Sequence, residues 1–272
     1  MSEKIALLVV DCQNDFCDPN GSLFVKGAEG DVVRMANLIF RFGEKINNIY
    51  ATMDWHPYLS IFHNVLWEDQ NGKTPDPFTT ISWVDLINKK YMPKNKKDDM
   101  EYECALTYTK KVEDKTGCQL VLWPVHCVQG TWGSNIVPGV NTAFQDWQRK
   151  TAKNVEYILK GTNPFTENYG AFKTEVAVDG ADGMKYNFDL FMKLAASDTI
   201  LVGGEAGSHC VSKTIEQLTY PKPDAYGVDD PIKKVVWLED AISPVSGFEE
   251  KQEKFIEWAK TKGMRAAKTT DF

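Results

Sequence analysis

The sequence predicts an α/β fold, in which a six-stranded, mainly parallel sheet carries helices on both faces. One observation is that short apolar runs alternate with segments of helical periodicity along most of the chain. Strands that alternate with helices pair in parallel and build layered α/β domains. A second observation is the length of 272 residues with 43% hydrophobic residues, which suffices for one domain with a large core.

The expected elements follow from the spacing of apolar residues. Strands are expected where β-branched and other apolar residues form short runs, at residues 5–10, 49–53, 155–159, 199–203, 235–238 and 264–267. Helices are expected where apolar residues recur every three or four positions, at residues 31–46, 188–196 and 249–260. Together they account for the sheet and part of its helical cover.

Residues 64–120 do not follow this alternation and are expected to form an insertion. The segment is polar and includes the lysine- and aspartate-rich run MPKNKKDD. A connection this long inside a compact domain is usually a lid, a binding surface or a disordered segment. We expect one domain over residues 1–272, with the insertion closing over the site or lying beside it. Trp67, Phe78 and Trp83 should be buried against the sheet, and the charged run should face water.

Composition excludes several classes of protein. The net charge of -7 and the lack of a basic run argue against a nucleic-acid-binding protein. The N-terminal apolar run is too short for a signal peptide, and no other run approaches a membrane span. The six cysteines are scattered without a CxxC pair, which is typical of free thiols in a reducing compartment. We therefore expect a cytoplasmic protein that binds neither nucleic acid nor membranes.

Reactive side chains stand at the ends of the predicted strands. Four strands end in Asp11, Asp54, Lys160 and Asp240, and a fifth leads through a glycine-rich turn to Cys210. Each alone has an ordinary explanation, because such residues often serve as caps, surface charges or small buried groups. Ligands of open parallel sheets bind at the carboxyl ends of the strands, so the coincidence predicts one site there. A helix start and a nearby cation would favour the Cys210 thiolate.

A metal site is predicted beside these residues. Asp54 and His56 are two positions apart, so on an extended segment their side chains point to the same side, and His126 supplies a third ligand. Two imidazoles and one carboxylate suit a divalent ion, which we expect to be zinc, with iron or manganese as alternatives. We expect Cys127 to point away as an extended neighbour of His126. His63 is expected at the surface or behind a ligand.

Five segments now point to one family: VVDCQNDF, DWHP, WPVHC, LKG with ENYGAF, and GGEAGSHCV, in this order. Together they resemble the nicotinamidases of the isochorismatase-like cysteine hydrolase superfamily, over residues 5 to 244. The resemblance implies the isochorismatase-like fold and the hydrolysis of nicotinamide to nicotinate and ammonia in NAD salvage. It implies a small amide as ligand, a bound divalent metal ion and a possible homo-oligomer.

The resemblance also implies roles for individual residues. Asp11 matches the general base, Lys160 the cation and Cys210 the nucleophile of a triad that forms a thioester. The metal ligands match Asp54, His56 and His126, and the substrate pocket matches Phe16, Trp123 and Tyr169. The backbone N–H groups of Ala206 and Cys210 match the oxyanion hole, beside a cis peptide bond between Glu205 and Ala206.

Three positions depart from the family pattern. Glu205 stands where an aliphatic residue is usual, Ser208 where an acid is usual, and Ser60 where a histidine is common. The insertion is also longer than in compact members. Three alternatives stay open: an amidase for another small amide, a non-catalytic binding member, and a zinc hydrolase in which metal-bound water attacks.

Overall fold

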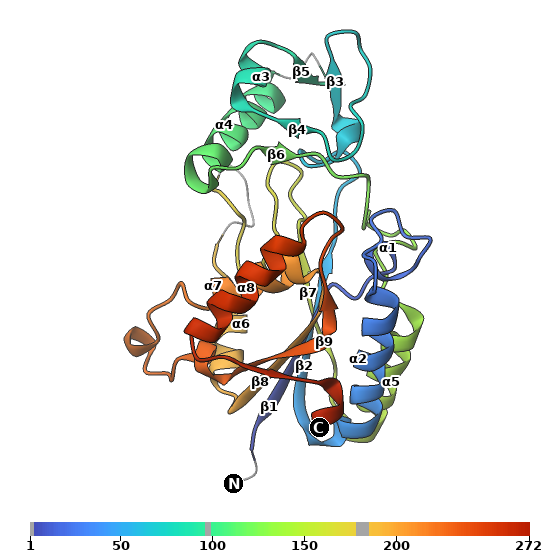
Figure 1. Ribbon diagram of the computed structural model, residues 1–272, viewed down its shortest axis with the longest axis vertical. Coiled ribbons are helices and arrows are strands. Elements are labelled where there is room, and N and C mark those ends of the chain that lie inside the picture. The colour runs from blue at the N-terminus through green and yellow to red at the C-terminus, as the bar shows by residue number, and fades with distance from the viewer. Residues whose placement is uncertain (1–2, 96–98, 178–184) are drawn as a thin grey trace.

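A computed structural model describes residues 3–95, 99–177 and 185–272 (Figure 1). Its centre is a six-stranded sheet in the order β10-β9-β8-β1-β2-β7, and every neighbouring pair is parallel. The predicted fold class is confirmed. The strands are β1 (Ile5–Val10), β2 (Ile46–Asp54), β7 (Glu156–Lys160), β8 (Thr199–Glu205), β9 (Val235–Ser243) and β10 (Arg265–Ala267).

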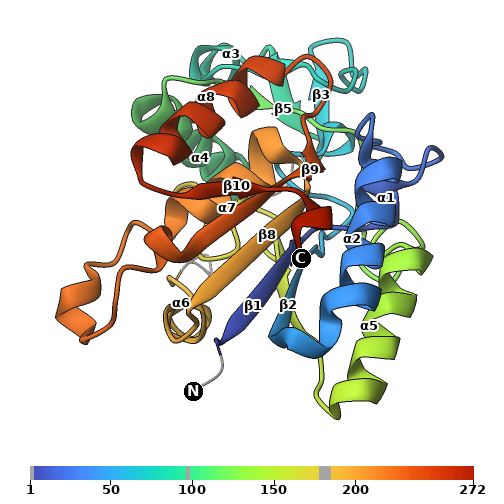
Figure 2. The same ribbon diagram turned by 60° about the horizontal axis from the view of Figure 1, so that its bottom comes forward.

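Helices cover both faces of the sheet, as Figures 1 and 2 show. One layer contains α2 (Ala28–Phe42) and α5 (Pro138–Thr151), and the other contains α6 (Phe188–Ala195), α7 (Ser212–Gln217) and α8 (Glu249–Thr261). The short helix α1 (Asn14–Cys17) follows β1. Strand β1 contributes side chains to a hydrophobic core on each face of the sheet. Leu7 packs in the core that includes α2, and Leu8 packs in the core that includes α6.

The structure corrects two expected elements and adds a helix that was not expected. Helix α2 ends at Phe42 rather than at residue 46, because a 3₁₀ turn follows and Ile46 already begins β2. Helix α5 was not predicted, although its buried residues Val140 and Phe144 stand at helical spacing. Strand β9 runs on to Ser243, so Asp240 lies inside the strand and not at its end. Its carboxylate accepts hydrogen bonds from Thr269, and it takes no part in the candidate site.

The insertion forms a small substructure beyond the carboxyl ends of the strands (Figure 1). It contains α3 (Trp83–Ile87), α4 (Asp99–Thr116) and two antiparallel pairs, β3 (Trp67–Asp69) with β5 (Tyr91–Pro93) and β4 (Thr80–Ile81) with β6 (Leu120–Val121). Trp67 is fully buried and its indole N–H donates to the carbonyl of Ile61.

Two expectations for the insertion fail and one cannot be compared. Phe78 is 51% exposed, so its predicted burial is wrong. Trp83 is half-buried under the ammonium of Lys110, 4.7 Å from its ring, and not against the sheet. Part of the charged run, residues 96–98, lies outside the described residues.

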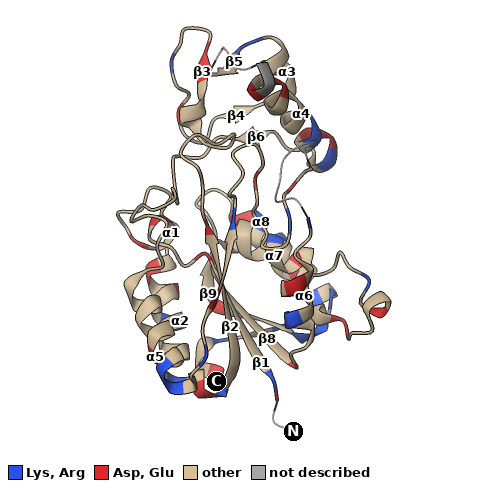
Figure 3. Cartoon of the chain, turned by 180° about the vertical axis from the view of Figure 1, so that it is seen from behind, with Lys and Arg blue, Asp and Glu red and all other residues tan. Residues whose placement is uncertain are grey.

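Charged side chains of both signs are distributed over the surface elements (Figure 3). Within the described ranges, no helix has both the length and the apolar character that crossing a membrane requires.

Candidate active site

Four charged or reactive side chains meet at the carboxyl end of the sheet. The Nζ atom of Lys160 lies 2.8 Å from Oδ2 of Asp11, 2.5 Å from Oδ1 of Asp54 and 3.5 Å from Sγ of Cys210. All four side chains are buried. Asp11 follows β1, Asp54 ends β2, and Lys160 ends β7 as the register partner of Asp54. Parallel pairing therefore brings the three predicted triad residues together.

The charges in this cluster favour a neutral thiol beside an ammonium. Burial raises the pKa of Cys210 well above its ordinary value; the carboxylates add to this and Lys160 opposes it. Burial also raises the pKa of Asp11, with Lys160 again opposing. Burial lowers the pKa of Lys160, but Asp11 and Asp54 outweigh it and hold that pKa well above normal. At neutral pH the thiol is protonated and Lys160 is charged.

The turn after β8 presents Cys210 to this cluster. The peptide bond between Glu205 and Ala206 is cis, as the resemblance implies. A π-helical turn, Gly207–Val211, follows it and leads into α7. Such turns are rare and are frequent at functional sites. Ala206 and Cys210 both line the small cavity at the site.

The three predicted metal ligands also lie together. Asp54, His56 and His126 each offer a ligand atom, and these atoms lie within 4.8 Å of one another. Oδ2 of Asp54 is 3.5 Å from Nε2 of His56. Burial raises the pKa of Asp54, but Lys160 and His56 outweigh it and hold the carboxyl ionised. Asp54 thus faces Lys160 with one oxygen and the histidines with the other.

Backbone carbonyls set the tautomers of the two histidines. Nδ1 of His56 lies 2.9 Å from the carbonyl oxygen of Gly161, and Nδ1 of His126 lies 2.8 Å from that of Pro124. A carbonyl can only accept, so in the neutral form of each ring Nδ1 carries the proton and Nε2 keeps its lone pair. Among the described residues, Nε2 of His56 is buried without a hydrogen-bond partner. This orphaned lone pair fits a divalent metal ion.

A second group of possible ligands does not fit a metal ion. Asp11, Asp54 and Cys210 also place ligand atoms within 4.8 Å of one another. The ammonium of Lys160 contacts all three side chains. It already balances the carboxylate charges there, so one ion at the histidine cluster is the arrangement that the residues support.

His63 lies behind the metal-ligand cluster and not at the surface. Its ring centroid is 5.0 Å from that of His126 and 5.5 Å from that of His56. Its Nδ1 lies 3.0 Å from the carbonyl oxygen of Tyr58. Burial lowers the pKa of His63 to about 2, with the neighbouring histidines adding to the effect. It therefore stays neutral and packs against the ligands.

Cys127 stays outside the ligand group for a reason other than the one expected. Its φ of 46° lies in the left-handed region, so the chain is not extended there. Its Sγ lies 3.9 Å from the carbonyl oxygen of Gly133, and its N–H donates to Oδ2 of Asp15 at 2.6 Å.

The predicted pocket residues surround a cavity of 30 Å³ beside Cys210. Phe16, Trp123 and Tyr169 line it together with Asp54 and His126. The ring of Phe16 is 5.5 Å from that of His126, and the indole N–H of Trp123 donates to the hydroxyl of Tyr169 at 3.1 Å. These aromatic walls suit a flat ring.

Glu167 also lines this cavity and was missed by the sequence reasoning. It is buried, and burial raises its pKa to about 7, against the opposing effect of His56. It belongs to the quoted segment ENYGAF, but no feature of the sequence marks this glutamate as buried.

Two further missed residues hold the backbone of the site. The amide of Gln13 donates to the carbonyl of Asp54 and accepts from its N–H, both at 2.7 Å. The carboxylate of Asp15 accepts from Cys127 N–H and so fixes the segment that carries His126. Both belong to VVDCQNDF, so their signal was present in the motif.

The departures Glu205 and Ser208 are accommodated by local partners. Burial raises the pKa of Glu205 well above normal and Asp31 adds to this, so Glu205 is a neutral acid at the position where the family has an aliphatic residue. It accepts from the N–H of Ser243 at 3.2 Å. The hydroxyl of Ser208 accepts from the N–H of Val245 at 3.0 Å. At the third departure, the hydroxyl of Ser60 donates to the carbonyl of Pro57.

Comparison with known proteins yields relatives of one kind. The nicotinamidase of Saccharomyces cerevisiae is 27% identical over 208 residues, which cover 76% of this chain and 78% of that protein. The nicotinamidase of Acinetobacter baylyi is 27% identical over 234 residues, covering 86% and 83%. This chain resembles nicotinamidases. No protein-family model matches it.

Solved structures of nicotinamidases and a pyrazinamidase share the fold. The yeast nicotinamidase aligns with a TM-score of 0.64 at 24% identity, over 97% of this chain and 99% of that one. The pyrazinamidase of Pyrococcus horikoshii, solved in complex with zinc, aligns with a TM-score of 0.55 at 22% identity, over 97% and 99%. The isochorismatase-like architecture expected from the sequence is thus the one observed.

Proposed function

We propose that this protein is a cysteine amidohydrolase that converts nicotinamide to nicotinate and ammonia. The observation that carries the proposal is the contact of one buried ammonium, that of Lys160, with Asp11, Asp54 and Cys210. The similarity to nicotinamidases in sequence supports the choice of substrate. The reaction supplies nicotinate for NAD salvage.

In the first half of the reaction, Asp11 takes the proton of the Cys210 thiol. The raised pKa of the thiol means that this proton must be removed, and Lys160 stabilises the thiolate as it forms. The sulfur attacks the carboxamide carbon and gives a tetrahedral oxyanion. We assign the backbone N–H groups of Ala206 and Cys210 to hold this oxyanion.

In the second half, the proton on Asp11 passes to the leaving nitrogen. The C–N bond breaks, ammonia departs and a thioester to Cys210 remains. A water molecule then gives one proton to Asp11 and attacks the thioester carbon. When the C–S bond breaks, the sulfur recovers a proton from Asp11, and the carboxylic acid product loses its own proton to water.

A divalent ion held by Asp54, His56 and His126 would bind the ring nitrogen of the substrate and orient its carboxamide. We propose zinc, because the donor set suits it and a pyrazinamidase of the same fold was solved with zinc. Phe16, Trp123 and Tyr169 are proposed to sandwich and align the ring. All six cysteines are free, which supports a reducing, cytoplasmic location.

Residues 64–120 are proposed to act as a lid within a single domain of residues 1–272. Tyr108 of α4 accepts a hydrogen bond from the N–H of Glu167, so the insertion contacts a residue of the site directly. His56 and His126 flank the insertion in sequence and lie together in space, with ring centroids 4.9 Å apart. Both ends of the insertion are therefore anchored at the proposed metal.

The test is ammonia release from nicotinamide and pyrazinamide by the metal-loaded protein, compared with Cys210→Ala and with the matched control Cys118→Ala. Cys118 is exposed, so its variant should keep wild-type turnover. The Cys210→Ala variant should fold, as judged by circular dichroism, and release no ammonia. Turnover by this variant near the wild-type rate would favour attack by metal-bound water. Absence of turnover in the wild type with either amide would refute the proposed substrate.

A further inference from the structure

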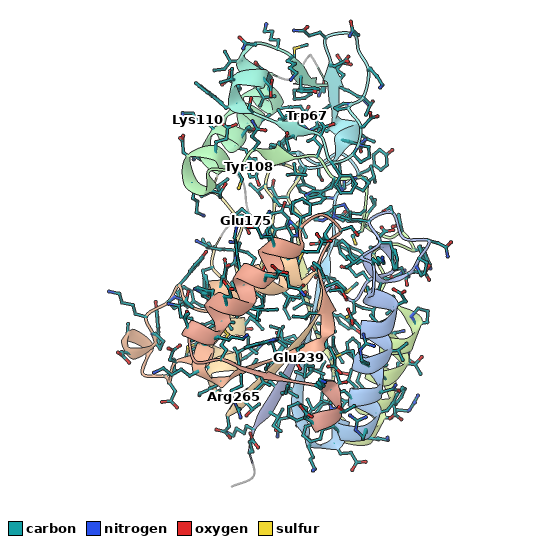
Figure 4. All side chains as sticks on the ribbon, in the orientation of Figure 1. Trp67, Tyr108, Lys110, Glu175, Glu239 and Arg265 are labelled. Atoms are coloured by element: carbon teal, nitrogen blue, oxygen red, sulfur yellow. The ribbon has the colours of Figure 1, made fainter. Side chains whose placement is uncertain are left out.

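A second cavity, of 410 Å³, adjoins the catalytic pocket. It lies between the insertion and the body of the protein, where Tyr108 and Glu175 are labelled in Figure 4. It shares Trp123, Glu167 and Tyr169 with the catalytic pocket, as well as His209. This space is far larger than the 30 Å³ beside Cys210, and most of its lining residues do not line the catalytic pocket.

The walls of this cavity are largely apolar and aromatic. Both the insertion and the body contribute to them, through Val112, Leu120, Trp123, Phe255 and Trp258. Aromatic and aliphatic walls with a few polar groups are typical of sites for small aromatic molecules. The shape and lining therefore suit a flat ring.

One hydrogen-bond donor on the boundary between the two cavities has no partner. The ring of His209 is more than nine-tenths buried, and its Nε2 makes no hydrogen bond to any described residue. Its Nδ1 lies 2.9 Å from the hydroxyl of Ser208, which already accepts from the N–H of Val245. The tautomer in which Ser208 donates its proton to Nδ1 satisfies both groups, and it leaves the proton of His209 on Nε2. In this tautomer, the buried Nε2–H of His209 has no hydrogen-bond acceptor among the described residues.

Two lysines add positive charge on the same side. Burial lowers the pKa of His209, and Lys251 and Lys213 lower it further. Burial also lowers the pKa of Lys251, and Lys213 adds to this effect. Lys213, Lys251 and His209 all line this cavity. Lys213 pairs with Glu216 at 2.7 Å. Lys251 stands exposed at the rim over the ring of Phe248, and no ion pair to a described carboxylate reaches it.

The acidic residues of the cavity leave this positive side uncompensated. The carboxylate of Glu216 forms an ion pair with Lys213, and the carboxylate of Glu175 lies 4.0 Å from the same ammonium. Burial raises the pKa of Glu167 to about 7, which weakens its negative charge near neutral pH, and burial also raises the pKa of Glu175. Among the described residues, the buried Nε2–H of His209 has no hydrogen-bond partner, and the exposed ammonium of Lys251, which water solvates, has no carboxylate partner.

We propose that this cavity is a second binding site, which takes an aromatic carboxylate. Its apolar walls would hold the ring, and His209 and Lys251 would hold the carboxylate. The proposal rests on the proposed function for its natural ligand, because hydrolysis turns a neutral amide into an aromatic carboxylate. The second cavity then receives the product through His209 and Lys251 as it leaves Cys210.

Benzoate is the probe, because it is an aromatic carboxylate without the ring nitrogen that a catalytic metal would bind. Its binding to the full, metal-loaded protein is measured by calorimetry, with neutral benzamide for comparison. To close the catalytic pocket, Cys210 is alkylated with iodoacetamide in a Cys118→Ser background, since Cys118 lines the second cavity. We expect benzoate affinity to survive alkylation within about twofold, and benzamide to bind at least about tenfold more weakly.

Variants then locate the carboxylate. Lys251→Met and His209→Phe should each weaken benzoate binding by roughly fivefold or more. The matched control is Lys254→Met, because Lys254 also lines the cavity but is exposed and paired with Glu250 at 2.7 Å; its effect should stay within about twofold.

The physiological ligand is identified by product inhibition. Nicotinate should inhibit amide hydrolysis in a mixed pattern, and Lys251→Met should weaken that inhibition by the same factor as it weakens benzoate binding. Loss of benzoate binding on alkylation, or equal binding by wild type and Lys251→Met, would overturn the second site. A protein that binds benzoate in this way but hydrolyses no nicotinamide would refute the proposed function and leave the site intact.

Discussion

Lys160 and Asp54 are register partners on neighbouring strands, and their side chains meet with Nζ 2.5 Å from Oδ1. The other oxygen of Asp54 lies 3.5 Å from Nε2 of His56. One carboxylate therefore joins the nucleophile's cluster to the metal-ligand cluster. A change at either cluster should be felt at the other through Asp54.

A comparison of Asp54→Asn with His126→Ala should separate the role of Asp54 as a metal ligand from its electrostatic effect on Cys210. Both variants remove a metal ligand, so metal affinity should fall by at least about 100-fold in each. Only Asp54→Asn also removes a negative charge that raises the pKa of Cys210. Iodoacetamide should therefore alkylate Cys210 faster in Asp54→Asn and at the wild-type rate in His126→Ala. Equal alkylation rates in the two variants would show that Asp54 does not couple the clusters.

Gly161→Ala should disrupt the metal site without touching a ligand. Gly161 has a φ of +66°, and a Cβ there would lie 2.2 Å from Cε1 of His56. The imidazole would have to move away from the carbonyl that fixes its tautomer. We expect metal affinity, measured by competition with a chelator, to fall by about 10- to 100-fold. Gly139→Ala is the control, since a Cβ there meets no atom within 4 Å.

Metal affinity should decline on acidification in a window that His56 sets. Burial lowers the pKa of His56, but Asp54 outweighs it and raises that pKa above 6.5. Burial lowers the pKa of His126 to about 4. Binding must displace the His56 proton, so affinity should begin to fall above pH 6.5, and not only below the roughly pH 6 that free imidazoles suggest.

The number of displaced protons checks this assignment. Between the two histidine pKa values, the logarithm of the association constant should change by about one per pH unit, because only His56 is protonated there. Titration of the metal at several pH values measures the slope. A slope of two near pH 6 would mean that His126 is protonated as well.

Glu167 should make the metal-free protein less stable as the pH rises. Its folded-state pKa of about 7 exceeds the ordinary value of 4.5, so the unfolded chain ionises first. The contribution of the neutral acid is present below pH 4.5 and is lost as the pH rises through 7, a change of about 3 kcal/mol. Glu167→Gln should lack this loss. The free energy of unfolding in urea should therefore rise in the variant relative to the wild type between pH 4.5 and 8. A pH-independent difference would contradict the assignment.

Trp67→Ala tests whether the insertion and the sheet unfold together. Trp67 is fully buried within the insertion, so its removal should cost about 3–5 kcal/mol. If residues 1–272 form one domain, a single unfolding transition should shift and activity should vanish with it. An early transition of the insertion alone, with the sheet unfolding at the wild-type midpoint, would indicate an independent unit.

The site was largely predictable because the chain order of strands and their end residues determines which side chains meet. A strand with a clear apolar pattern ends at or shortly before each of the four residues Asp11, Asp54, Lys160 and Cys210. Parallel pairing of these strands brings their carboxyl ends, and so the four side chains, to one edge of the sheet. Asp240 was misplaced because β9 continues through a charged pair, so the end of the apolar run was not the end of the strand. Glu167 was missed because a buried carboxyl has no signature in the local sequence. Its environment comes from Tyr108 and His56, which are distant in the chain.

The position of β7 at the rim of the sheet has a consequence for how activity returns after unfolding. β7 has a hydrogen-bonded neighbour on one side only, and it brings Lys160 to the cluster. A slip by one residue against β2 would turn the lysine to the opposite face, leaving the fold intact and the thiol without its cation. Edge strands are among the segments that open most readily. Recovery of catalysis during refolding should therefore lag behind recovery of secondary structure. The time at which amide hydrolysis returns then measures when β7 pairs with β2 in the correct register.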